Sequence, residues 1–331
     1  MSAGSAAAVY AGCRVIITGG LGFIGSNLAR RLVGLGAEVV LVDSLIPAYG
    51  GNPFNISGIE DRVTVNVADV RDRFAMDHLV KGCRVMFNLA GTLSHIDSMT
   101  DPLTDLEINC RSQLSILEAC RSNNPDIKVV FAGTRGQYGR AIYLPVDEKH
   151  PLNPTDVNGI NNSAGEAYHI LYCRVHGLRA TSLRLTNTYG PRHQMRHHRQ
   201  GIINWFVRLA LEGREIRLFG DGSQVRDTNY VDDVLEALLL AGASESADGE
   251  VFNLGGHPAK LLEVVEVIAS LTGARSSMVP FPDDVGAIEV GDYVADWSKA
   301  ERVLGWRPTV SLETGMTRTI DFYRQHREHY W

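Results

Sequence analysis

The sequence predicts an α/β fold with a doubly wound parallel sheet, followed by a smaller C-terminal lobe. Short apolar runs alternate with helical patterns up to about residue 190, a glycine-rich turn follows the first run, and the pattern loosens after about residue 186. The chain has 331 residues, of which 44% are hydrophobic and 21% charged. This composition is ordinary for a globular protein with a substantial core.

The expected strands are short runs rich in branched apolar residues. In chain order they are residues 14–20 (RVIITGG), 38–43 (EVVLVD), 63–69 (VTVNVAD), 85–91 (VMFNLAG), 127–134 (IKVVFAGT) and 179–190 (RATSLRLTNTYG). The first of these runs is continuous and apolar, which indicates a buried strand.

Helical patterns separate these strands. They cover residues 23–36, which end at a glycine, and residues 105–122 and 163–177. After residue 186, loops rich in glycine, proline and histidine mix with helices. We therefore expect the domain boundaries to be 11–185, with about 225–257, for the sheet domain, and 186–224 and 258–331 for the second lobe.

Charge and cysteine content restrict the class of protein. The net charge of −6 argues against a nucleic-acid-binding surface, which needs a basic face, but allows a small anionic substrate. Five cysteines without a Cys-x-x-Cys pair indicate reduced thiols and a cytoplasmic protein. Residues 2–12 lack the features of a signal peptide, and no apolar run approaches the roughly 20 residues of a membrane span.

The glycine-rich turn, Thr18 to Gly25 (TGGLGFIG), follows the first strand and opens the first helix. Gly19 allows a tight turn, Gly22 lets the backbone approach a pyrophosphate, and Gly25 lets helix and strand pack closely. Asp43 ends the second strand, where its carboxylate can accept hydrogen bonds from ribose hydroxyls and would repel a 2′-phosphate. The pattern therefore predicts a dinucleotide site that prefers NAD to NADP.

With these features the chain resembles the extended short-chain dehydrogenases/reductases, in their nucleotide-sugar epimerase/dehydratase branch. The resemblance covers nearly the whole chain through the segments TGGLGFIG, VADVRD, NLAG, EINCRSQLSILEA, RLTNTYGP, QVRDTNYVDDV and GDYVADWSKAERVLGWRP. It implies a Rossmann-type doubly wound parallel sheet, a C-terminal substrate-binding lobe, a nucleotide-sugar substrate and a homodimer formed through helices at about 103–122 and 158–177.

The resemblance also implies roles for individual residues. Asp69 and Val70 would contact adenine, and Asn109 would hold the central helix. The cofactor-binding residues implied are Gly19, Gly22, Phe23, Ile24, Gly25, Asp43, Asp69, Val70, Leu89, Ala90, Gly91, Asn109 and Asn162. The substrate-binding residues implied are Asn187, Arg192 and Arg226.

One part of the family pattern is altered. Members of the family carry a Ser/Thr after the fifth strand, here Thr134, and a Tyr-x-x-x-Lys pair that opens the next helix. Counting back from Glu166, the tyrosine position is Asn158 and the lysine position is Asn162. An amide cannot act as a general base near neutral pH. Asn158 could still orient a hydroxyl or carbonyl of the substrate, and Asn162 could hydrogen-bond a ribose hydroxyl but adds no positive charge.

Three explanations of this change remain open. Another side chain performs the proton transfer, and the candidates are His95, Asp97 and Asp156, although Asp156 could equally be a helix N-cap. Alternatively, the protein binds NAD and a sugar nucleotide without turnover. In the third explanation, one or both asparagines were introduced to trap a complex.

The residues after Thr134 restrict the reaction. Dehydratases of the family carry an Asp-Glu pair at this point and decarboxylating relatives carry a glutamate, whereas this chain has Arg135 and Gly136. Epimerisation or simple redox chemistry at a sugar hydroxyl remains, with NAD as a bound catalyst.

The segment 191–201 (PRHQMRHHRQG) is rich in basic side chains that could pair with a diphosphate. His193 and His197 stand four residues apart, but no carboxylate joins them and the reaction needs no metal, so we predict no metal site. Glu289 occupies the approximate position of a second phosphate-binding arginine found in many nucleotide-sugar epimerases. Either the arginines of segment 191–201 substitute for it, or the substrate is not an ordinary UDP-sugar.

Overall fold

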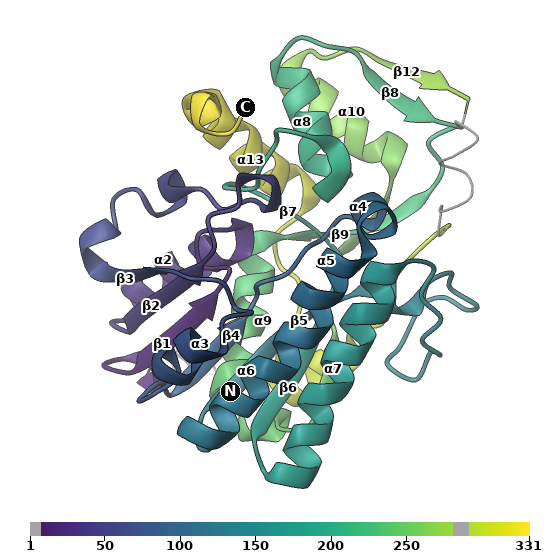
Figure 1. The fold of residues 1–331 in the computed structure, drawn as a ribbon. Coiled ribbons are helices and arrows are strands. Elements are labelled where there is room, and N and C mark those ends of the chain that lie inside the picture. Colours follow the sequence, from purple (N-terminus) through teal and green to yellow (C-terminus); the bar gives the residue numbers. More distant parts are fainter. Residues whose placement is uncertain (1–7, 281–290) are drawn as a thin grey trace.

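The computed structural model describes residues 8–280 and 291–331, so the prediction concerning Glu289 lies outside the described residues (Figure 1). Its main sheet has seven parallel strands in the order β10-β6-β5-β4-β1-β2-β3. Their bounds are β1 Arg14–Thr18, β2 Glu38–Asp43, β3 Val63–Val67, β4 Val85–Asn88, β5 Lys128–Thr134, β6 Arg179–Leu185 and β10 Val251–Asn253. The order reverses direction between β1 and β4, which creates a topological switch point.

The six strands expected from the sequence are present, with one division. The run 179–190 splits into β6 and β7 Asn187–Tyr189, and β7 leaves the main sheet to pair with β9 Val225–Tyr230. The three-residue strand β10 is additional, and it extends the sheet beyond β6. A strand of three residues is too short for a hydrophobic pattern to be recognised in the sequence.

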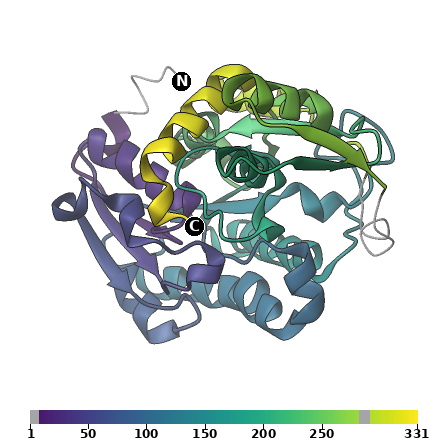
Figure 2. The ribbon, with the colours of Figure 1, turned by 90° about the horizontal axis from the view of Figure 1, so that it is seen from above.

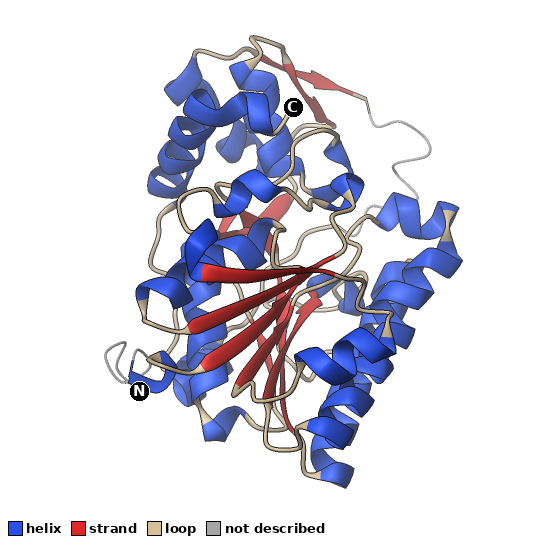
Figure 3. Ribbon diagram, turned by 60° about the vertical axis from the view of Figure 1, so that its left-hand side comes forward, coloured by secondary structure: helices blue, strands red, loops and turns tan. Residues whose placement is uncertain are grey.

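Helices cover both faces of this sheet, and Figure 3 shows the sheet between its two helical layers. On one face lie α2 Phe23–Gly34 and α9 Val231–Ala243; on the other lie α3 Arg73–Leu79, α6 Ser112–Asn123 and α7 Val157–His176. Alternate side chains of β1 face the two layers: Val15 and Ile17 enter one core cluster and Ile16 enters the other. Burial on both faces explains the continuous apolar runs of the strands.

The helices that carry the later site residues differ from the sequence pattern at their starts. Helix α7 begins at Val157, six residues before the expected 163, because Asp156 caps it by accepting a hydrogen bond from the Gly159 amide at 2.7 Å. The expected helix 105–122 is composed of α5 Pro102–Leu106, a π-helical turn Glu107–Arg111 and α6. Before them, the short helix α4 His95–Thr100 begins at the end of the loop that follows β4.

The C-terminal lobe lies over the carboxyl ends of the strands, as Figure 1 and the view from above in Figure 2 show. It contains a three-stranded sheet (β11-β9-β7) and a two-stranded sheet (β12-β8). Its elements are β8 Ile216–Phe219, β11 His257–Lys260, β12 Ser276–Val279, α8 Ile202–Leu211, α10 Leu261–Thr272 and α13 Leu312–His326. Helix α12 Ser298–Leu304 instead packs beside β10 and α9 of the main-sheet domain. No helix within residues 8–280 and 291–331 combines the length and apolarity needed to span a bilayer.

A buried ion pair fastens α7 to the sheet. The Arg184 guanidinium on β6 donates to both carboxylate oxygens of Glu166 on α7, with Nε 3.0 Å from Oε2, and both side chains are buried. Ser182 also donates to Glu166 Oε2 at 2.7 Å, and the Arg184 guanidinium lies 4.7 Å from the centre of the Tyr138 ring. This network fixes the helix whose first turns form one wall of the site.

We predict that Glu166→Ala lowers the free energy of unfolding by about 3–5 kcal/mol, because the Arg184 charge would be left buried without its partner. Denaturant-induced unfolding measures the effect. Asp321→Ala, which breaks an exposed pair with Arg324, is the matched control and should change stability by less than about 1 kcal/mol. Equal effects of the two substitutions would contradict this account of α7.

Candidate active site

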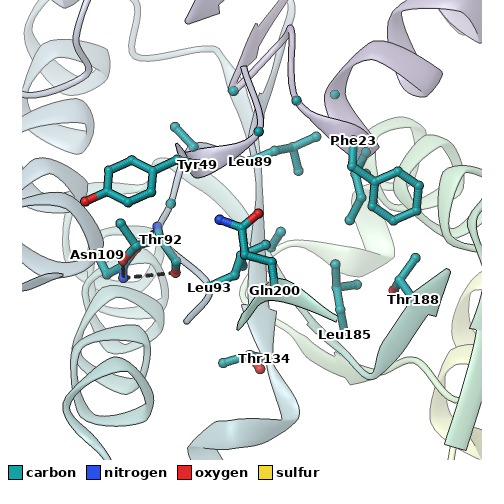
Figure 4. A pocket seen from close by; sticks show the side chains of 18 of the residues that line it. Phe23, Tyr49, Leu89, Thr92, Leu93, Asn109, Thr134, Leu185, Thr188 and Gln200 are labelled. Carbon is teal, nitrogen blue, oxygen red and sulfur yellow. Dashed lines mark hydrogen bonds between the residues drawn. The ribbon is translucent and has the colours of Figure 1, made fainter. Parts of the chain in front are cut away.

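A cavity of 290 Å³ opens at the carboxyl ends of the main-sheet strands, beside the switch point between β1 and β4. Its walls come from the loops after the strands and from the segment 193–204 of the C-terminal lobe. Figure 4 shows Tyr49, Thr92 and Asn109 on one side of the cavity and Phe23 and Thr188 on the other.

The glycine-rich turn forms one end of the cavity through very close backbone contacts. A Cβ at Gly25 would lie 2.2 Å from the Gly19 carbonyl oxygen, so no other residue fits there. Gly19 has a φ of +66°, and a Cβ on it would lie 3.0 Å from the Leu89 carbonyl oxygen. The N-terminus of α2 therefore faces the cavity with unshielded N–H groups, a geometry that suits a pyrophosphate.

Asp43 lies at the end of β2, where the turn that follows is built around its carboxylate. Oδ2 accepts the Leu21 N–H at 3.0 Å, and Oδ1 accepts the Leu45 N–H at 2.9 Å. Burial raises the pKa of Asp43, and these two bonds offset part of the rise. Each oxygen retains acceptor capacity toward the cavity, as ribose hydroxyls would require.

The loops after β3 and β4 complete the wall that was expected to hold a dinucleotide. Val70 is buried, while the Arg71 guanidinium holds the pKa of Asp69 below its usual range against the opposing effect of burial. The Leu89 and Ala90 amides donate to the Thr18 hydroxyl at 3.0 and 3.1 Å. These bonds bring the end of β4 against the glycine turn.

Asn109, in the π-helical turn, holds the next part of this loop. It accepts the Thr92 N–H at 3.0 Å and donates to the Thr92 carbonyl at 3.2 Å. A Cβ at Gly91 would lie 2.9 Å from Asn109 Oδ1, so the close approach requires the glycine.

All residues predicted to bind the cofactor line this cavity, together with three predicted for catalysis or substrate binding. They are Gly19, Gly22, Phe23, Ile24, Gly25, Asp43, Asp69, Val70, Leu89, Ala90, Gly91, Asn109, Asn162, His95, Thr134 and Asn187. Segments separated by up to 168 positions (from Gly19 to Asn187) thus meet around one space.

His95 and Asp156 form a pair at the edge of this cavity. His95 Nδ1 lies 2.5 Å from Asp156 Oδ2, while the other oxygen of Asp156 caps α7. Burial raises the pKa of Asp156, but the hydrogen bond and positive charge of His95 and two backbone bonds outweigh it and bring the pKa below its usual value. Because Nδ1 is engaged, Nε2 is the ring nitrogen available for proton transfer.

Thr134 is close to this pair. Its hydroxyl lines the cavity and accepts the Gly136 N–H at 3.1 Å. His95 Cε1 is 3.3 Å from the position that a Cβ on Gly136 would occupy, so the imidazole lies against the turn that follows Thr134. A sugar hydroxyl could therefore meet an imidazole and a threonine hydroxyl in the same region.

Asn158 does not line the cavity but is buried behind its wall. Its Nδ2 donates to the Thr92 carbonyl at 2.8 Å and to Asp105 Oδ2 at 2.9 Å, while Asn162 Nδ2 donates to its carbonyl at 2.9 Å. Only Asn162 of the two reaches the cavity. Asn158 was expected to orient a substrate group, but in the structure its side chain makes contacts within the protein instead.

Four further predicted residues lie outside the cavity lining, each for a physical reason. Asp156 stands behind His95, and Asp97 forms an ion pair with Arg199 at 2.6 Å. Arg192 donates to Asn27 at 2.8 Å and covers the Phe322 ring, and Arg226 donates to the Gly291 carbonyl at 2.9 Å. Sequence position identified the correct loops but not the direction of these side chains.

The segment 193–201 closes the cavity from the lobe side. Gln200 donates to the Ala48 carbonyl at 2.9 Å, in the turn after β2. Both ring nitrogens of His193 face backbone carbonyls, and burial lowers its pKa to about 4. Within the described ranges, no group of three His, Cys, Asp or Glu side chains could hold a metal ion.

Several lining or neighbouring residues were not predicted from the sequence. Thr92, Tyr49, Gln194 and Gln200 line the cavity, and Asp105 lies behind Thr92. Asp105 stands four residues before Asn109 in the matched helical segment, and this i,i+4 spacing was the available signal. The others lie in loops, where spacing carries little information about position.

Comparison with known proteins places this site in a family. The model of the "NAD dependent epimerase/dehydratase family" matches residues 15–255. The chain belongs to the NAD-dependent epimerase/dehydratase family.

Its relatives agree with this assignment over their full length. A putative UDP-glucose 4-epimerase from Methanocaldococcus jannaschii is 34% identical, and the match covers 94% of this chain and 98% of the relative. The structure of the UDP-glucose 4-epimerase from Thermotoga maritima with UDP-glucose is 31% identical with a TM-score of 0.86, covering 95% of this chain and 99% of that one. A dTDP-glucose 4,6-dehydratase from Streptomyces venezuelae with NAD bound is 27% identical with a TM-score of 0.87, covering 96% and 98%.

These findings confirm the α/β fold and the predicted family. The relatives are nucleotide-sugar epimerases and dehydratases, and NAD is present in solved structures of the family. The glycine-rich turn Thr18 to Gly25, called the glycine cradle from here on, and the Asp43 carboxylate of this chain fit the same cofactor.

We predict that Gly25→Ala weakens NAD binding at least tenfold, because a Cβ 2.2 Å from the Gly19 carbonyl forces the turn apart. Calorimetric titration with NAD measures the loss. Gly34→Ala in the same helix meets no atom within 4 Å and should leave binding unchanged while stabilising the fold by up to about 1 kcal/mol. Unimpaired binding by Gly25→Ala would contradict the assigned cradle.

Proposed function

We propose that this protein is an NAD-dependent epimerase, or a related redox isomerase, of a nucleotide-activated sugar, and that it uses an altered proton relay. The observation that carries the proposal is one cavity that combines the glycine cradle and Asp43 with His95 and Thr134. NAD held there would supply the acceptor and donor of hydride. Asp43 would favour NAD over NADP, since its charge repels a 2′-phosphate.

His95 and Asp156 would replace the tyrosine and lysine. As hydride leaves a sugar carbon, His95 Nε2 takes the proton of the hydroxyl on that carbon, and it returns the proton when hydride comes back to the other face. Asp156 accepts the Nδ1–H, fixes the tautomer and stabilises the imidazolium, and its lowered pKa keeps it ionised. Thr134 would hydrogen-bond the reacting hydroxyl.

The surroundings of Asn158 support a working site rather than a damaged or trapped one. Asn158 and its neighbour Asn161 both donate to the buried Asp105 carboxylate, at 2.9 and 2.8 Å. A tyrosine removed by a single substitution would leave unfilled space and unpaired partners. Here the amide is fully engaged, which is why we favour the altered relay over an inactive nucleotide binder.

The substrate class follows from the family and the cavity. The relatives act on UDP- and dTDP-sugars according to their names, and Asn187 of this chain lines the cavity with Gln194 and Gln200. Arg135 after Thr134, in place of an acid, favours epimerisation over dehydration. Arg192 and Arg226 would support the substrate lobe from behind rather than clamp a phosphate directly.

We also propose a homodimer through α5, the π-helical turn, α6 and α7. These elements expose apolar side chains at helical spacing: Leu103, Leu106, Leu114, Ile160, Leu171 and Val175. Two such faces would bury each other's apolar area. Sedimentation velocity tests this, and a monomer at micromolar concentration would contradict it.

The function is tested with purified protein and NAD in D₂O, using a panel of UDP-, GDP-, CDP- and dTDP-sugars followed by NMR and NADH absorbance. We expect a new sugar or an exchanged sugar proton, and we expect His95→Gln to lower turnover at least 100-fold with substrate binding retained. His198→Gln, on the exposed turn nearby, is the control. Binding of a sugar nucleotide without any chemistry would favour the silent binder.

Introducing the tyrosine and lysine that the family pattern places at positions 158 and 162 should not increase turnover. We predict that Asn158→Tyr combined with Asn162→Lys leaves turnover unchanged or lowers it, because the tyrosine ring cannot replace the amide bonds to Thr92 and Asp105. Steady-state kinetics and a thermal melt of the double variant check this. A large gain in turnover would contradict the altered relay and favour the trapped-site explanation.

A further inference from the structure

We infer that Asp105 selects the oxidation state of the cofactor, because its buried negative charge favours the oxidised nicotinamide ring, which is positively charged, over the neutral reduced ring. The inference rests on the proposed function, since it requires NAD in the cavity. Asp105 lies in α5 and is only 3% exposed. It takes part in neither the glycine cradle nor the His95–Asp156 pair.

Four uncharged side chains from three segments surround the Asp105 carboxylate. Oδ2 accepts from the Thr92 hydroxyl at 2.7 Å, Asn158 Nδ2 at 2.9 Å and Asn109 Nδ2 at 3.0 Å. Oδ1 accepts from Asn161 Nδ2 at 2.8 Å. The loop after β4, the π-helical turn and the start of α7 therefore all close on one carboxylate.

The hydrogen-bond pattern presents only donors to this carboxylate. Asn109 accepts the Thr92 N–H and Asn158 donates to the Thr92 carbonyl, so backbone atoms fix which end of each amide faces Asp105. Both amides present N–H groups to it. A carboxylate that receives only donors is suited to carry a negative charge, whereas an added proton would point at another donor.

This charge has no cation beside it. Every side chain found to hydrogen-bond to Asp105 within residues 8–280 and 291–331 is neutral, and the ion pairs found there involve its neighbours Asp97 and Glu107 instead. Buried charges are little screened by salt. The negative charge of Asp105 is therefore neither neutralised by a cationic partner nor screened by water.

The field reaches the cavity because Asp105 stands one residue behind its wall. Thr92 and Asn109, which both donate to Asp105, line the cavity on the side shown in Figure 4. Tyr49, also on that side, has a raised pKa, caused first by burial and then by nearby carboxylates that include Asp105. At position 162, where the resemblance places a lysine, this chain has an asparagine, so that position adds no positive charge to the wall.

The test measures the Kd of NAD⁺ and the Kd of NADH for each purified variant and compares their ratio. We expect Asp105→Asn to raise Kd(NAD⁺)/Kd(NADH) by roughly tenfold, which corresponds to one unit charge about 12 Å from the ring at an effective dielectric constant of about 20. Asn162→Lys adds a positive charge to the same wall and should shift the ratio in the same direction. Asn162→Met, which is similar to lysine in length but uncharged, should shift the ratio less than Asn162→Lys. Asp221→Asn, in an exposed turn, is the control and should leave the ratio unchanged.

The outcomes separate this inference from the proposed function. If wild-type protein binds both nucleotides and neither charge change alters the ratio, the inference is overturned while the proposed function stands. If Asp105→Asn does not fold, Asn162→Lys against Asn162→Met decides by the same ratio. If wild-type protein binds neither nucleotide, the proposed function fails and the inference fails with it.

Discussion

The parallel direction of the main-sheet strands is the constraint on which the whole site depends. Because all seven strands point the same way, the loops that follow them meet at one edge, and the reversal of strand order beside β1 opens a space there. The glycine turn follows β1, Asp43 ends β2, His95 follows β4 and Thr134 ends β5. Residues far apart in sequence face one cavity for this reason alone.

Two buried carboxylates then fix the chemistry of that edge. Asp156 binds Gly159 with one oxygen and His95 with the other, so the residue that starts α7 also orients the proposed acid–base group. Asp105 holds the preceding loop through Thr92 and the start of α7 through Asn158. The segment from Thr92 to His95 is therefore fastened at both ends.

Much of the fold and the cofactor wall could be predicted from the sequence because these features depend on local rules. Apolar runs covered on both faces gave the six strands, and the Gly19-x-x-Gly22-x-x-Gly25 spacing gave the turn whose backbone contacts admit no Cβ. The sheet then brought every predicted cofactor residue to one cavity. The short strand β10 was missed, since three residues carry little pattern. The hydrophobic period alone began the next helix at 163, because asparagines are weak helix formers, whereas the resemblance and the Asp156 cap placed its start correctly.

The sequence by itself determined the fold class and the loops that form the site, because hydrophobic period and glycine spacing act over short ranges, and its motifs carried the resemblance to the family. The strand order came from the structure. Only the tertiary structure decided where the side chains on those loops point. It placed Arg192 against Phe322, paired Asp97 with Arg199 and sent Asn158 toward Asp105 rather than into the cavity. Those directions depend on which buried polar groups need partners across the fold, and spacing along one chain does not encode such long-range pairing.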